Sequence, residues 1–399
     1  GIFTQRMFDY CIVDEASQIT LPVCLGPIRM ARTFILVGDH YQLPPLVQNK
    51  EAQEGGLDVS LFKLLSDSHP DSVVNLEHQY RMCEDIMLLS NTLIYSGRLK
   101  CGTADVAVRS LTVPNIGGLK QHHPSTFPQP RSQRQVCLGT SQGRCWLKDL
   151  VEPSAKTRLV NTDTLSIPAL DVANGSRIVN PTEATICSRL VEAFISCGIP
   201  ARSIGVIALY RSQLSLLKQH LSRYLPELEM HTADKFQGRD KEVIILSCVR
   251  SNTDKNVGDL LRDWRRVNVA FTRARTKLLV VGSKSTLRDG NELLGKYVKL
   301  VQERGWVYDL PRDAMTDHIF ESEMVPSQSC LDRSTPSPKK GKSPVSSKKT
   351  TRSPFGPVQT RLSPTGLKKP AKRGAKLMSG GRVLGNRPVL QDMVNDLIG

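Results

Sequence analysis

The sequence predicts an α/β protein that contains two parallel sheets. Short apolar runs alternate with amphipathic segments over most of residues 1–310. These runs are apolar on both faces, as is typical of strands that helices cover on each side of a parallel sheet. The predicted strands lie at 8–14, 33–39, 72–76, 157–163, 204–210, 241–249 and 277–283.

The segments between these runs carry helical periodicity. The predicted helices lie at 56–67, 83–97, 181–198, 211–225 and 264–275. Residues 103–150 are different, because they are rich in Pro, Gln and Gly with little periodicity, and they predict a flexible excursion between two α/β units. From about residue 311 the apolar content almost disappears, which predicts a disordered basic tail.

Charge and cysteine content exclude several classes of protein. The formal net charge is +16, but residues 331–399 hold 15 Lys or Arg against 3 Asp or Glu, so the basic charge belongs mainly to the tail. The 10 cysteines include no C-x-x-C pair, which favours a reduced, intracellular protein over a disulfide or zinc framework. No run approaches the ~18 apolar residues of a membrane span.

Two carboxylates follow the first predicted strand directly, in "IVDEASQ". A strand delivers such residues to its carboxyl end, where ligands bind in open α/β sheets. Asp14 would hold Mg²⁺ through water, and Glu15 would polarise the water that attacks a γ-phosphate. The alternative is an ordinary acidic strand end that leads into a helix.

The second strand ends in a similar way, in "FILVGDHYQLPP". It places Asp39 and Gln42 after the strand, where a glutamine amide can contact both a γ-phosphate and its water. The two prolines that follow stiffen the loop. Downstream, "LEHQYRM" places Arg81 after a further strand, where its guanidinium could act as an arginine finger. A Pro-rich turn and a surface arginine are the ordinary alternatives.

Two further stretches carry candidate residues. "HTADKFQGRD" contains a Gln-Gly turn before a strongly apolar strand. "WRRVNVAFTRAR" predicts a helix on which Arg266, Asn268, Thr272 and Arg273 project at helical spacing. Because Arg266 and Arg273 are seven residues apart, they would share a face and could jointly bind a triphosphate. Two solvated arginines are the alternative.

The order of these blocks resembles the superfamily-one helicases. "VDEASQ" is similar to motif II, "LVGDHYQLPP" to motif III, "QYRM" to motif IV, "TADKFQGRD" to motif V and "RRVNVAFTRAR" to motif VI. The residues of the "DEAS" and "QYRM" motifs resemble those of the group that moves 5′ to 3′ and includes the nonsense-decay RNA helicases. Within it, the chain looks most like the eukaryotic DNA replication ATP-dependent helicase/nucleases, over roughly residues 1–310 apart from 115–145.

The resemblance implies two RecA-like, P-loop NTPase-type domains that close on ATP and move along a single strand. Residues 1–76 would be the truncated first domain with motifs II and III, 77–155 would hold motif IV, the connecting helix and the excursion, 156–310 the second domain, and 311–399 the tail. The implied catalytic residues are Asp14, Glu15, Gln42, Arg81 and Arg273. The implied ATP contacts are Asp39, Gln237, Gly238, Asp240 and Arg266, and the candidate DNA contacts are Tyr210, Arg211 and Thr232.

The chain also departs from the family. No G-x-x-x-x-G-K-[ST] occurs in its 399 residues, and the family's nuclease domain with its iron–sulfur cysteines is absent. We therefore expect that the chain begins inside the first domain and that alone it neither hydrolyses ATP efficiently nor cuts DNA. The expected cofactors are ATP and Mg²⁺, with a 4Fe-4S cluster only in an upstream nuclease domain.

The resemblance also implies partners and a location. The expected partners are single-stranded or flapped DNA, a single-strand-binding protein and replication and repair factors. A monomer in the nucleus is expected, and a mitochondrial pool is compatible with the sequence. Two other readings stay open: an RNA helicase of the same group, and a noncatalytic nucleic-acid-binding interaction protein.

The tail carries its own signals. Ser337, Ser343, Ser353 and Ser363 each precede proline and are candidate phosphorylation sites beside basic residues. Residues 368–373 could serve as a nuclear import signal or a phosphate-binding patch. Apolar residues at helical spacing in 390–398 could form a short partner-binding helix. A solvated linker without function is the alternative.

Overall fold

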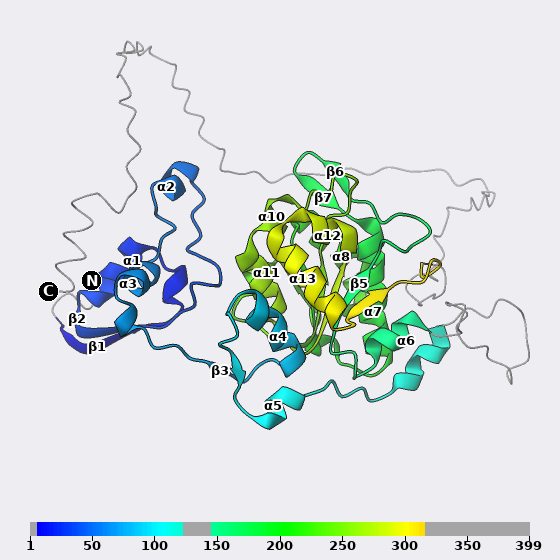
Figure 1. Ribbon diagram of the computed structural model, residues 1–399, viewed down its shortest axis with the longest axis horizontal. Helices are drawn as coiled ribbons and strands as arrows, with labels where there is room; N and C mark the ends of the chain where they lie inside the picture. The colour runs from blue at the N-terminus through cyan, green and yellow to red at the C-terminus, as the bar shows by residue number, and fades with distance from the viewer. Residues whose placement is uncertain (1–5, 123–144, 316–399) are drawn as a thin grey trace, which may run out of the picture. The chain divides into compact units, whose positions relative to one another are not determined.

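The computed structural model describes residues 6–122 and 145–315 (Figure 1). The chain divides into two units, 1–325 and 326–399, and the second unit lies outside the described residues. The four candidate phosphorylation serines, the basic stretch 368–373 and the predicted helix at 390–398 therefore also lie outside them.

The first described elements form a short parallel pair of strands. In this pair β1 (Phe8–Val13) runs beside β2 (Ala31–Leu36), as the apolar runs predict. The loop after each strand is joined to the other, because Val37 N donates to Val13 O at 2.8 Å and Ala16 N donates to Val37 O at 2.8 Å. The helices of this part are α1 (Leu21–Ile28), α2 (Lys50–Glu54) and α3 (Leu61–Ser68).

The largest sheet has six strands in the order β12-β5-β11-β10-β8-β9. Every neighbouring pair is parallel, which confirms the predicted class. The central strands are almost wholly buried, as the two-sided apolar runs require. Their bounds are β5 (Thr157–Asn161), β8 (Ile204–Ala208), β9 (Glu229–His231), β10 (Lys241–Ser247), β11 (Ala274–Gly282) and β12 (Val307–Asp309).

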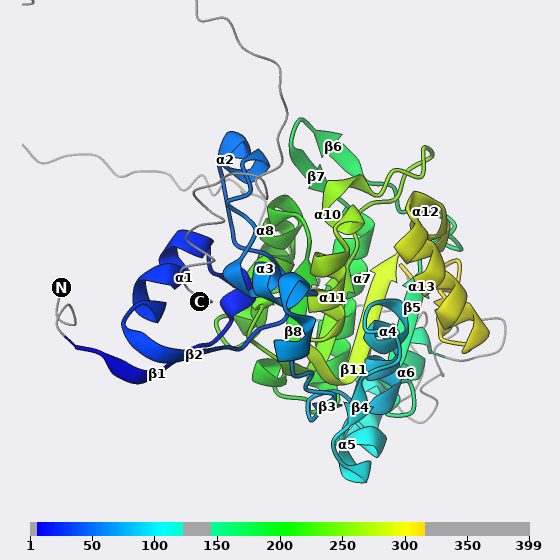
Figure 2. The same ribbon diagram turned by 60° about the vertical axis from the view of Figure 1, so that its left-hand side comes forward.

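Helices cover both faces of this sheet (Figures 1 and 2). One core joins strand residues such as Val206 to α6 (Trp146–Val151), α7 (Pro181–Ser196) and α8 (Arg211–His220). The opposite core joins strand residues such as Ile207 to α4, α9 and α10 through α13. These helices are α4 (Glu84–Leu93), α9 (Ala233–Phe236), α10 (Gly258–Arg262), α11 (Trp264–Phe271), α12 (Lys284–Gly290) and α13 (Glu292–Glu303).

Smaller elements complete the described chain. An antiparallel hairpin, β6 with β7, leads into α7, where the side chain of Asn180 accepts a hydrogen bond from Glu183 N and begins the helix. The bounds are β3 (His78–Gln79), β4 (Lys100–Cys101), α5 (Ala104–Val108), a 3-10 helix at Ile116–His122, β6 (Val172–Asn174) and β7 (Arg177–Val179).

The predicted strand at 72–76 is wrong. Ser72 belongs to a 3-10 helix (Pro70–Ser72), and no described strand includes or pairs with residues 73–76. Val74 and Leu76 remain 85% and 81% exposed. An apolar run becomes a buried strand only if a neighbouring strand and a covering helix are available to it.

The predicted excursion at 103–150 is wrong at both ends. Residues 104–108 form α5, and Trp146 and Leu147 of α6 are completely buried. Lys277 fixes the end of α6, because its Nζ donates to the carbonyls of Leu150 and Glu152. The tail boundary is also shifted, since Ala314 is buried and its carbonyl accepts a hydrogen bond from Arg189 at 3.0 Å. Residues 123–144 lie outside the described part.

Two further findings concern the described residues as a whole. No helix within 6–122 or 145–315 is long and apolar enough to cross a membrane. The cysteines in the same ranges are free thiols, and most of them are buried.

Candidate nucleotide site

Asp14 and Glu15 lie at the carboxyl end of β1, and both side chains are exposed. Glu15 has φ 50° and ψ 35°, a left-handed conformation that is strained for a residue other than glycine. Its backbone N–H donates to Asp14 Oδ1 at 2.9 Å, and its own Oε2 accepts a hydrogen bond from Gln18 Nε2 at 2.5 Å. The turn thus presents both carboxylates at one edge of the strand pair.

The loop after β2 lies against this turn. Asp39 N donates to Ser17 Oγ at 3.3 Å, and a Cβ on Gly38 would lie 2.9 Å from Ser17 N, so only glycine allows this close approach. Gln42 Nε2 donates to Asp39 Oδ2 at 2.9 Å. The predicted motif II and motif III residues therefore occupy one edge, as parallel strands require.

These donors fit Mg²⁺. Magnesium keeps most of its water and is usually held by one or two carboxylates together with substrate phosphates. Asp14 and Glu15 supply exposed carboxylates, and the hydrogen bond from Glu15 N occupies only Asp14 Oδ1. Within the described ranges no cluster of three or more His, Cys, Asp or Glu could hold a metal on its own. A phosphate-bound Mg²⁺ is thus the ion that the donor set suits.

Arg81 is held in a cluster of charged residues. Its Nε lies 3.3 Å from Asp240 Oδ2, and its Nη1 donates to Thr272 O at 3.2 Å. Asp240 also pairs with Arg275 at 2.9 Å. Because its carboxylate is shared between two guanidinium groups and would repel a phosphate, the structure places Asp240 as a residue that orients Arg81. The loop itself is fixed by Gln79 Oε1, which accepts the backbone N–H of Arg81 at 3.0 Å.

The helix predicted over 264–275 is too long. The structure ends α11 at Phe271, and β11 begins at Ala274 because Lys241 N donates to Arg273 O and draws this turn into the sheet. Arg266 and Arg273 therefore do not share one helical face. Arg266 instead pairs with Asp234 at 3.0 Å and with a carboxylate at the start of its own helix.

Arg273 is almost completely buried. Its Nε donates to Val269 O at 2.9 Å, its Nη1 to Arg239 O at 3.4 Å and its Nη2 to Thr272 Oγ1 at 2.7 Å. Burial, and next the positive charge of Arg81, lower the pKa of Arg273 to about 10. The charges of Asp240 and Glu15 act in the opposite direction. Arg273 is thus close enough to Arg81 and Glu15 for their charges to shift its pKa. Each of its side-chain nitrogens, however, already donates a hydrogen bond within the protein.

The backbone of the Gln-Gly turn is open to close approach by another group. Gly238 has φ +76°, and a Cβ there would meet no atom within 4 Å. Gln237 Nε2 is buried and has no hydrogen-bond partner among the described residues. An unpaired donor next to an open glycine is compatible with a bound anion at this turn.

The three candidate DNA contacts follow two strands of the large sheet. Tyr210 and Arg211 come after β8, and Thr232 comes after β9, so all three occupy the carboxyl edge. Arg211 is exposed, whereas Thr232 is 8% exposed. Tyr210 is partly buried against Gly258, where a Cβ would lie 2.6 Å from its hydroxyl. Of the three, Arg211 is the residue whose side chain reaches solvent most freely.

A buried polar cluster supports this edge, and our reading of the sequence missed it. Glu183 Oε2 accepts hydrogen bonds from Ser247 Oγ at 2.7 Å and from Val249 N at 2.8 Å. Val249 has φ 70°, a conformation that is costly for a β-branched residue. Gln213 on α8 joins the cluster through Ser247 Oγ. Burial raises the pKa of Glu183 to about 8. The only sequence signal was a single carboxylate in the otherwise uncharged start of α7.

The sequence reading also missed Tyr95. It lies just after α4, 56 positions from Asp39, and its hydroxyl donates to Asp39 Oδ2 at 2.6 Å. No local pattern links these two residues, because the contact is made by the fold.

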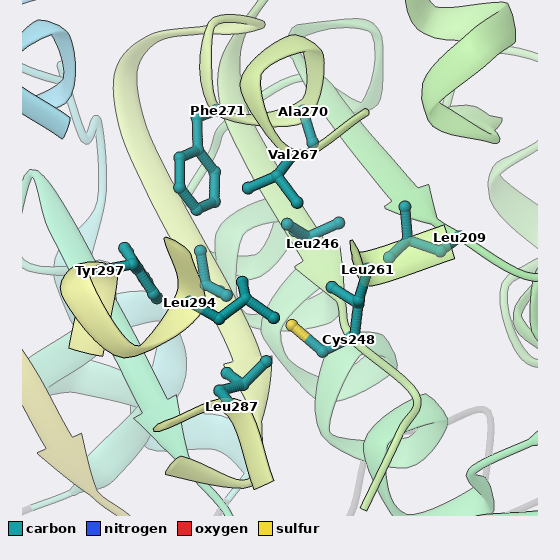
Figure 3. A pocket seen from close by; sticks show the side chains of 11 residues that line it. Leu209, Leu246, Cys248, Leu261, Val267, Ala270, Phe271, Leu287, Leu294 and Tyr297 are labelled. Atoms are coloured by element: carbon teal, nitrogen blue, oxygen red, sulfur yellow. The ribbon is translucent and has the colours of Figure 1, made fainter. Parts of the chain in front are cut away.

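The cavity in the core is unrelated to this chemistry (Figure 3). It lies between the sheet and α11, α12 and α13, and its lining is apolar. Residues such as Leu246, Phe271 and Leu294 point into it. A phosphate could not be solvated or paired there.

Comparison with known proteins supports the resemblance. Residues 57–285 match an AAA domain model, and residues 2–50 match a second AAA domain model. The chain is 41% identical over 335 residues to the "DNA replication ATP-dependent helicase/nuclease dna2" of Schizosaccharomyces pombe, covering 84% of this chain and 22% of that protein.

Relatives from two other organisms carry the same description. The protein named "DNA replication ATP-dependent helicase/nuclease DNA2" is 44% identical over 317 residues in Saccharomyces cerevisiae, covering 79% of this chain and 20% of that protein. The Homo sapiens protein of that name is 42% identical over 286 residues, covering 72% and 26%. The chain thus spans about a quarter or less of these relatives. Since the first family model alone matches more than half of its length, the chain belongs to the AAA domain family.

Proposed function

We propose that this chain is the motor portion of an ATP-dependent single-stranded-DNA translocase or helicase that moves 5′ to 3′ in DNA replication and repair. The observation that carries the proposal is the strained Glu15 turn, which presents Asp14 and Glu15 beside the Asp39–Gln42 loop. Strained non-glycine residues persist where the surrounding structure holds them, and they concentrate at functional sites.

Each residue has a definite part in this chemistry. Mg²⁺, when bound, neutralises charge on the phosphates. Asp14 would hold the ion through water, and Glu15 would accept a proton from the attacking water. Gln42 would orient that water and the γ-phosphate through its amide. Arg81 and Arg273 would stabilise the charge that develops on the transferred phosphoryl group.

The nucleotide would also contact the Gln-Gly turn and α11. Gln237 Nε2 has a free N–H to donate to a phosphate oxygen, and Gly238 leaves its backbone open to close approach. Arg266, which is partly exposed and paired with Asp234, could exchange that partner for a phosphate. Asp39 and Asp240 would act indirectly, by holding Gln42 and Arg81 in place.

The DNA strand would follow the carboxyl edge of the six-stranded sheet. Arg211 would bind a backbone phosphate there, Tyr210 would stack on a base, and Thr232 would donate to phosphate. The names of the relatives specify DNA replication, and this favours DNA over RNA as the substrate. We propose single-stranded or flapped DNA, together with a single-strand-binding protein and replication factors, as partners of a nuclear, monomeric protein.

The chain alone is proposed to hydrolyse ATP poorly. None of its 399 residues forms a G-x-x-x-x-G-K-[ST] loop, whose backbone N–H groups cradle phosphates. We also propose that nuclease activity, with the 4Fe-4S cluster expected for it, is not carried by these residues. Hydrolysis is therefore best measured on a fusion protein, in which residues 6–399 follow the sequence that precedes the matched region in the Schizosaccharomyces pombe relative.

Equilibrium binding to matched DNA and RNA single strands, at several salt concentrations, tests the proposed substrate. We expect tighter binding to DNA, and we expect it to survive deletion of residues 331–399, because the folded part makes the specific contacts. If deletion of the tail abolishes all binding, the chain is instead a scaffold with a basic nucleic-acid-binding tail. If RNA binds more tightly, the RNA helicase reading replaces ours.

A further inference from the structure

The carboxylate of Asp39 fixes the side chain of Gln42. Asp39 Oδ2 accepts a hydrogen bond from Gln42 Nε2, and Asp39 Oδ1 accepts one from Tyr41 N, both at 2.9 Å. The Gln42 N–H that is bonded to Asp39 is not available to another acceptor. For that N–H to reach a phosphate oxygen, Gln42 must leave Asp39.

A phenol shares the same acceptor atom. Tyr95 Oη donates to Asp39 Oδ2 at 2.6 Å, so Gln42 and Tyr95 both bond to one carboxylate oxygen. Burial, and next the negative charge of Asp39, raise the pKa of Tyr95 far above its ordinary value. The phenol therefore stays protonated and continues to donate. Any change in the position of Asp39 or in its occupancy acts directly on Tyr95.

Asn268 connects this phenol to α11. Its Nδ2 donates to Tyr95 Oη at 2.9 Å and to Tyr41 O at 3.0 Å. The Asn268 side chain is 1% exposed, and its Oδ1 has no hydrogen-bond partner within the described ranges. The amide is thus held from one side only, and it can change partners without first breaking a bond at Oδ1.

The last hydrogen bonds of this series connect Asn268 to the buried Arg273. The backbone carbonyl of Asn268 accepts a hydrogen bond from Thr272 Oγ1 at 2.9 Å, and Thr272 Oγ1 in turn accepts one from Arg273 Nη2 at 2.7 Å. A continuous series of bonds therefore joins the Gln42 amide to the Arg273 guanidinium. It runs through Asp39, Tyr95, Asn268 and Thr272.

We propose that Tyr95 and Asn268 form a hydrogen-bonded relay that couples the orientation of the Gln42 amide to the release of Arg273. The inference rests on the proposed function, since it matters only if Gln42 and Arg273 meet a triphosphate. When Gln42 turns toward the γ-phosphate, Asp39 Oδ2 loses one donor and the Tyr95–Asn268 pair moves, which loosens the bonds that hold Arg273. Tyr95 and Asn268 are positioning residues, because neither would touch the nucleotide.

The Tyr95→Phe variant tests the relay, because it removes one hydroxyl and keeps the ring. The matched control is Tyr308→Phe, since Tyr308 Oη also donates to a carboxylate, Asp149 Oδ2 on α6, at 3.0 Å. Hydrogen exchange of residues 264–273 is measured on the unmodified chain and on both variants. Single-strand-stimulated ATP hydrolysis is measured on the same variants, and on Asn268→Ala, in the fusion protein.

We expect Tyr95→Phe to speed exchange in α11 severalfold and Tyr308→Phe to leave it unchanged. In the fusion protein kcat should fall about tenfold, while KM for ATP and the affinity for single-stranded DNA stay constant. The double variant with Asn268→Ala should lose no more than either single variant, because the relay acts as a unit. A Tyr95→Phe protein that matches Tyr308→Phe in exchange and kcat would overturn the relay.

Failure of the proposed function and failure of the relay give different results. If the unsubstituted fusion protein does not hydrolyse ATP at all, the proposed function fails, and hydrogen exchange on the chain still decides whether Tyr95 controls α11. If the fusion protein is active but kcat ignores Tyr95, the relay fails and the proposed function stands. A fall in DNA affinity with constant kcat would also contradict the relay.

Discussion

Asp240 and Arg81 are joined by an ion pair of 3.3 Å, although 159 positions separate them in the sequence. Arg275 approaches the other oxygen of the same carboxylate at 2.9 Å. Asp240 therefore bridges two guanidinium groups and holds one of them, Arg81, where it donates to the carbonyl of Thr272. The charge that would stabilise phosphoryl transfer is thus held in place by a residue that would itself repel the phosphate.

This ion pair predicts the result of Asp240→Asn. Without the carboxylate, Arg81 keeps its charge but loses its fixed direction, so we expect kcat of the fusion protein to fall about tenfold. Removing an arginine finger altogether, by Arg81→Ala, should cost about a thousandfold or more. Steady-state ATP hydrolysis checks both, with Asp259→Asn, a fully exposed carboxylate on α10, as the control. Equal losses for Asp240→Asn and Arg81→Ala would contradict a positioning role.

The strained turn at Glu15 predicts that Glu15→Gly is more stable than Glu15→Ala, although both variants lose activity. Glycine adopts φ 50° without steric cost, so Glu15→Gly should raise the free energy of unfolding by about 1 kcal/mol relative to Glu15→Ala. Both variants should lose ATP hydrolysis in the fusion protein. Chemical denaturation and ATPase assays on the pair check this. A Glu15→Gly protein that is less stable than Glu15→Ala would show that the turn is not strained.

Glu183 predicts a pH dependence of stability. Its pKa is raised to about 8 in the folded protein from an ordinary value of 4.5, so the folded state binds more protons than the unfolded state between these values. The stabilisation is complete below the unfolded pKa and is lost as pH rises through about 8. Between pH 6 and pH 9 the loss should be about 3 kcal/mol.

The control for that effect is Glu183→Gln, which keeps the shape of the side chain but cannot ionise. Unfolding by urea at pH 6 and pH 9 should show a smaller loss of stability in Glu183→Gln than in the unsubstituted chain. An identical pH dependence in the two proteins would mean that Glu183 is ionised at both pH values.

Arg211 predicts a change in the salt dependence of DNA binding. A guanidinium that neutralises one backbone phosphate contributes about one unit to the slope of log affinity against log salt. We expect Arg211→Ala to weaken single-strand binding and to reduce that slope by about 1. Lys299→Ala, an exposed residue on α13, is the control. An unchanged slope for Arg211→Ala would place the DNA elsewhere.

Four of the six strands of the large sheet, β5, β8, β10 and β11, could be predicted from the sequence because burial on both faces leaves an uninterrupted apolar run. The carboxylates and Gln42 could be located for the same reason, since they follow such runs directly. The edge strands β9 and β12 were not predicted, because each is only three residues long and partly exposed. The run at 72–76 was misread because an apolar composition does not show whether a neighbouring strand is present. The end of α11 was misplaced because Lys241, which pairs with the turn at Arg273, is distant in sequence.

Contacts between distant residues account for what the sequence could not give. Tyr95 reads locally as the end of an amphipathic helix, and only the fold brings its hydroxyl to Asp39. Glu183 reads as one charged residue at the start of a helix, and only the fold surrounds it with Ser247 and the backbone of Val249. Charge and polarity mark such residues as unusual, but their partners are set by topology.

Single-strand-stimulated ATP hydrolysis by the fusion protein, with and without Glu15→Gln, tests the central claim most directly. Our account predicts hydrolysis that single-stranded DNA stimulates and that Glu15→Gln abolishes, since an amide cannot accept the proton of the attacking water. Glu51→Gln, on the exposed helix α2, should leave the rate unchanged. Absence of hydrolysis in the fusion protein, or an equal rate in Glu15→Gln, would contradict the assignment of these residues to an ATP-driven motor.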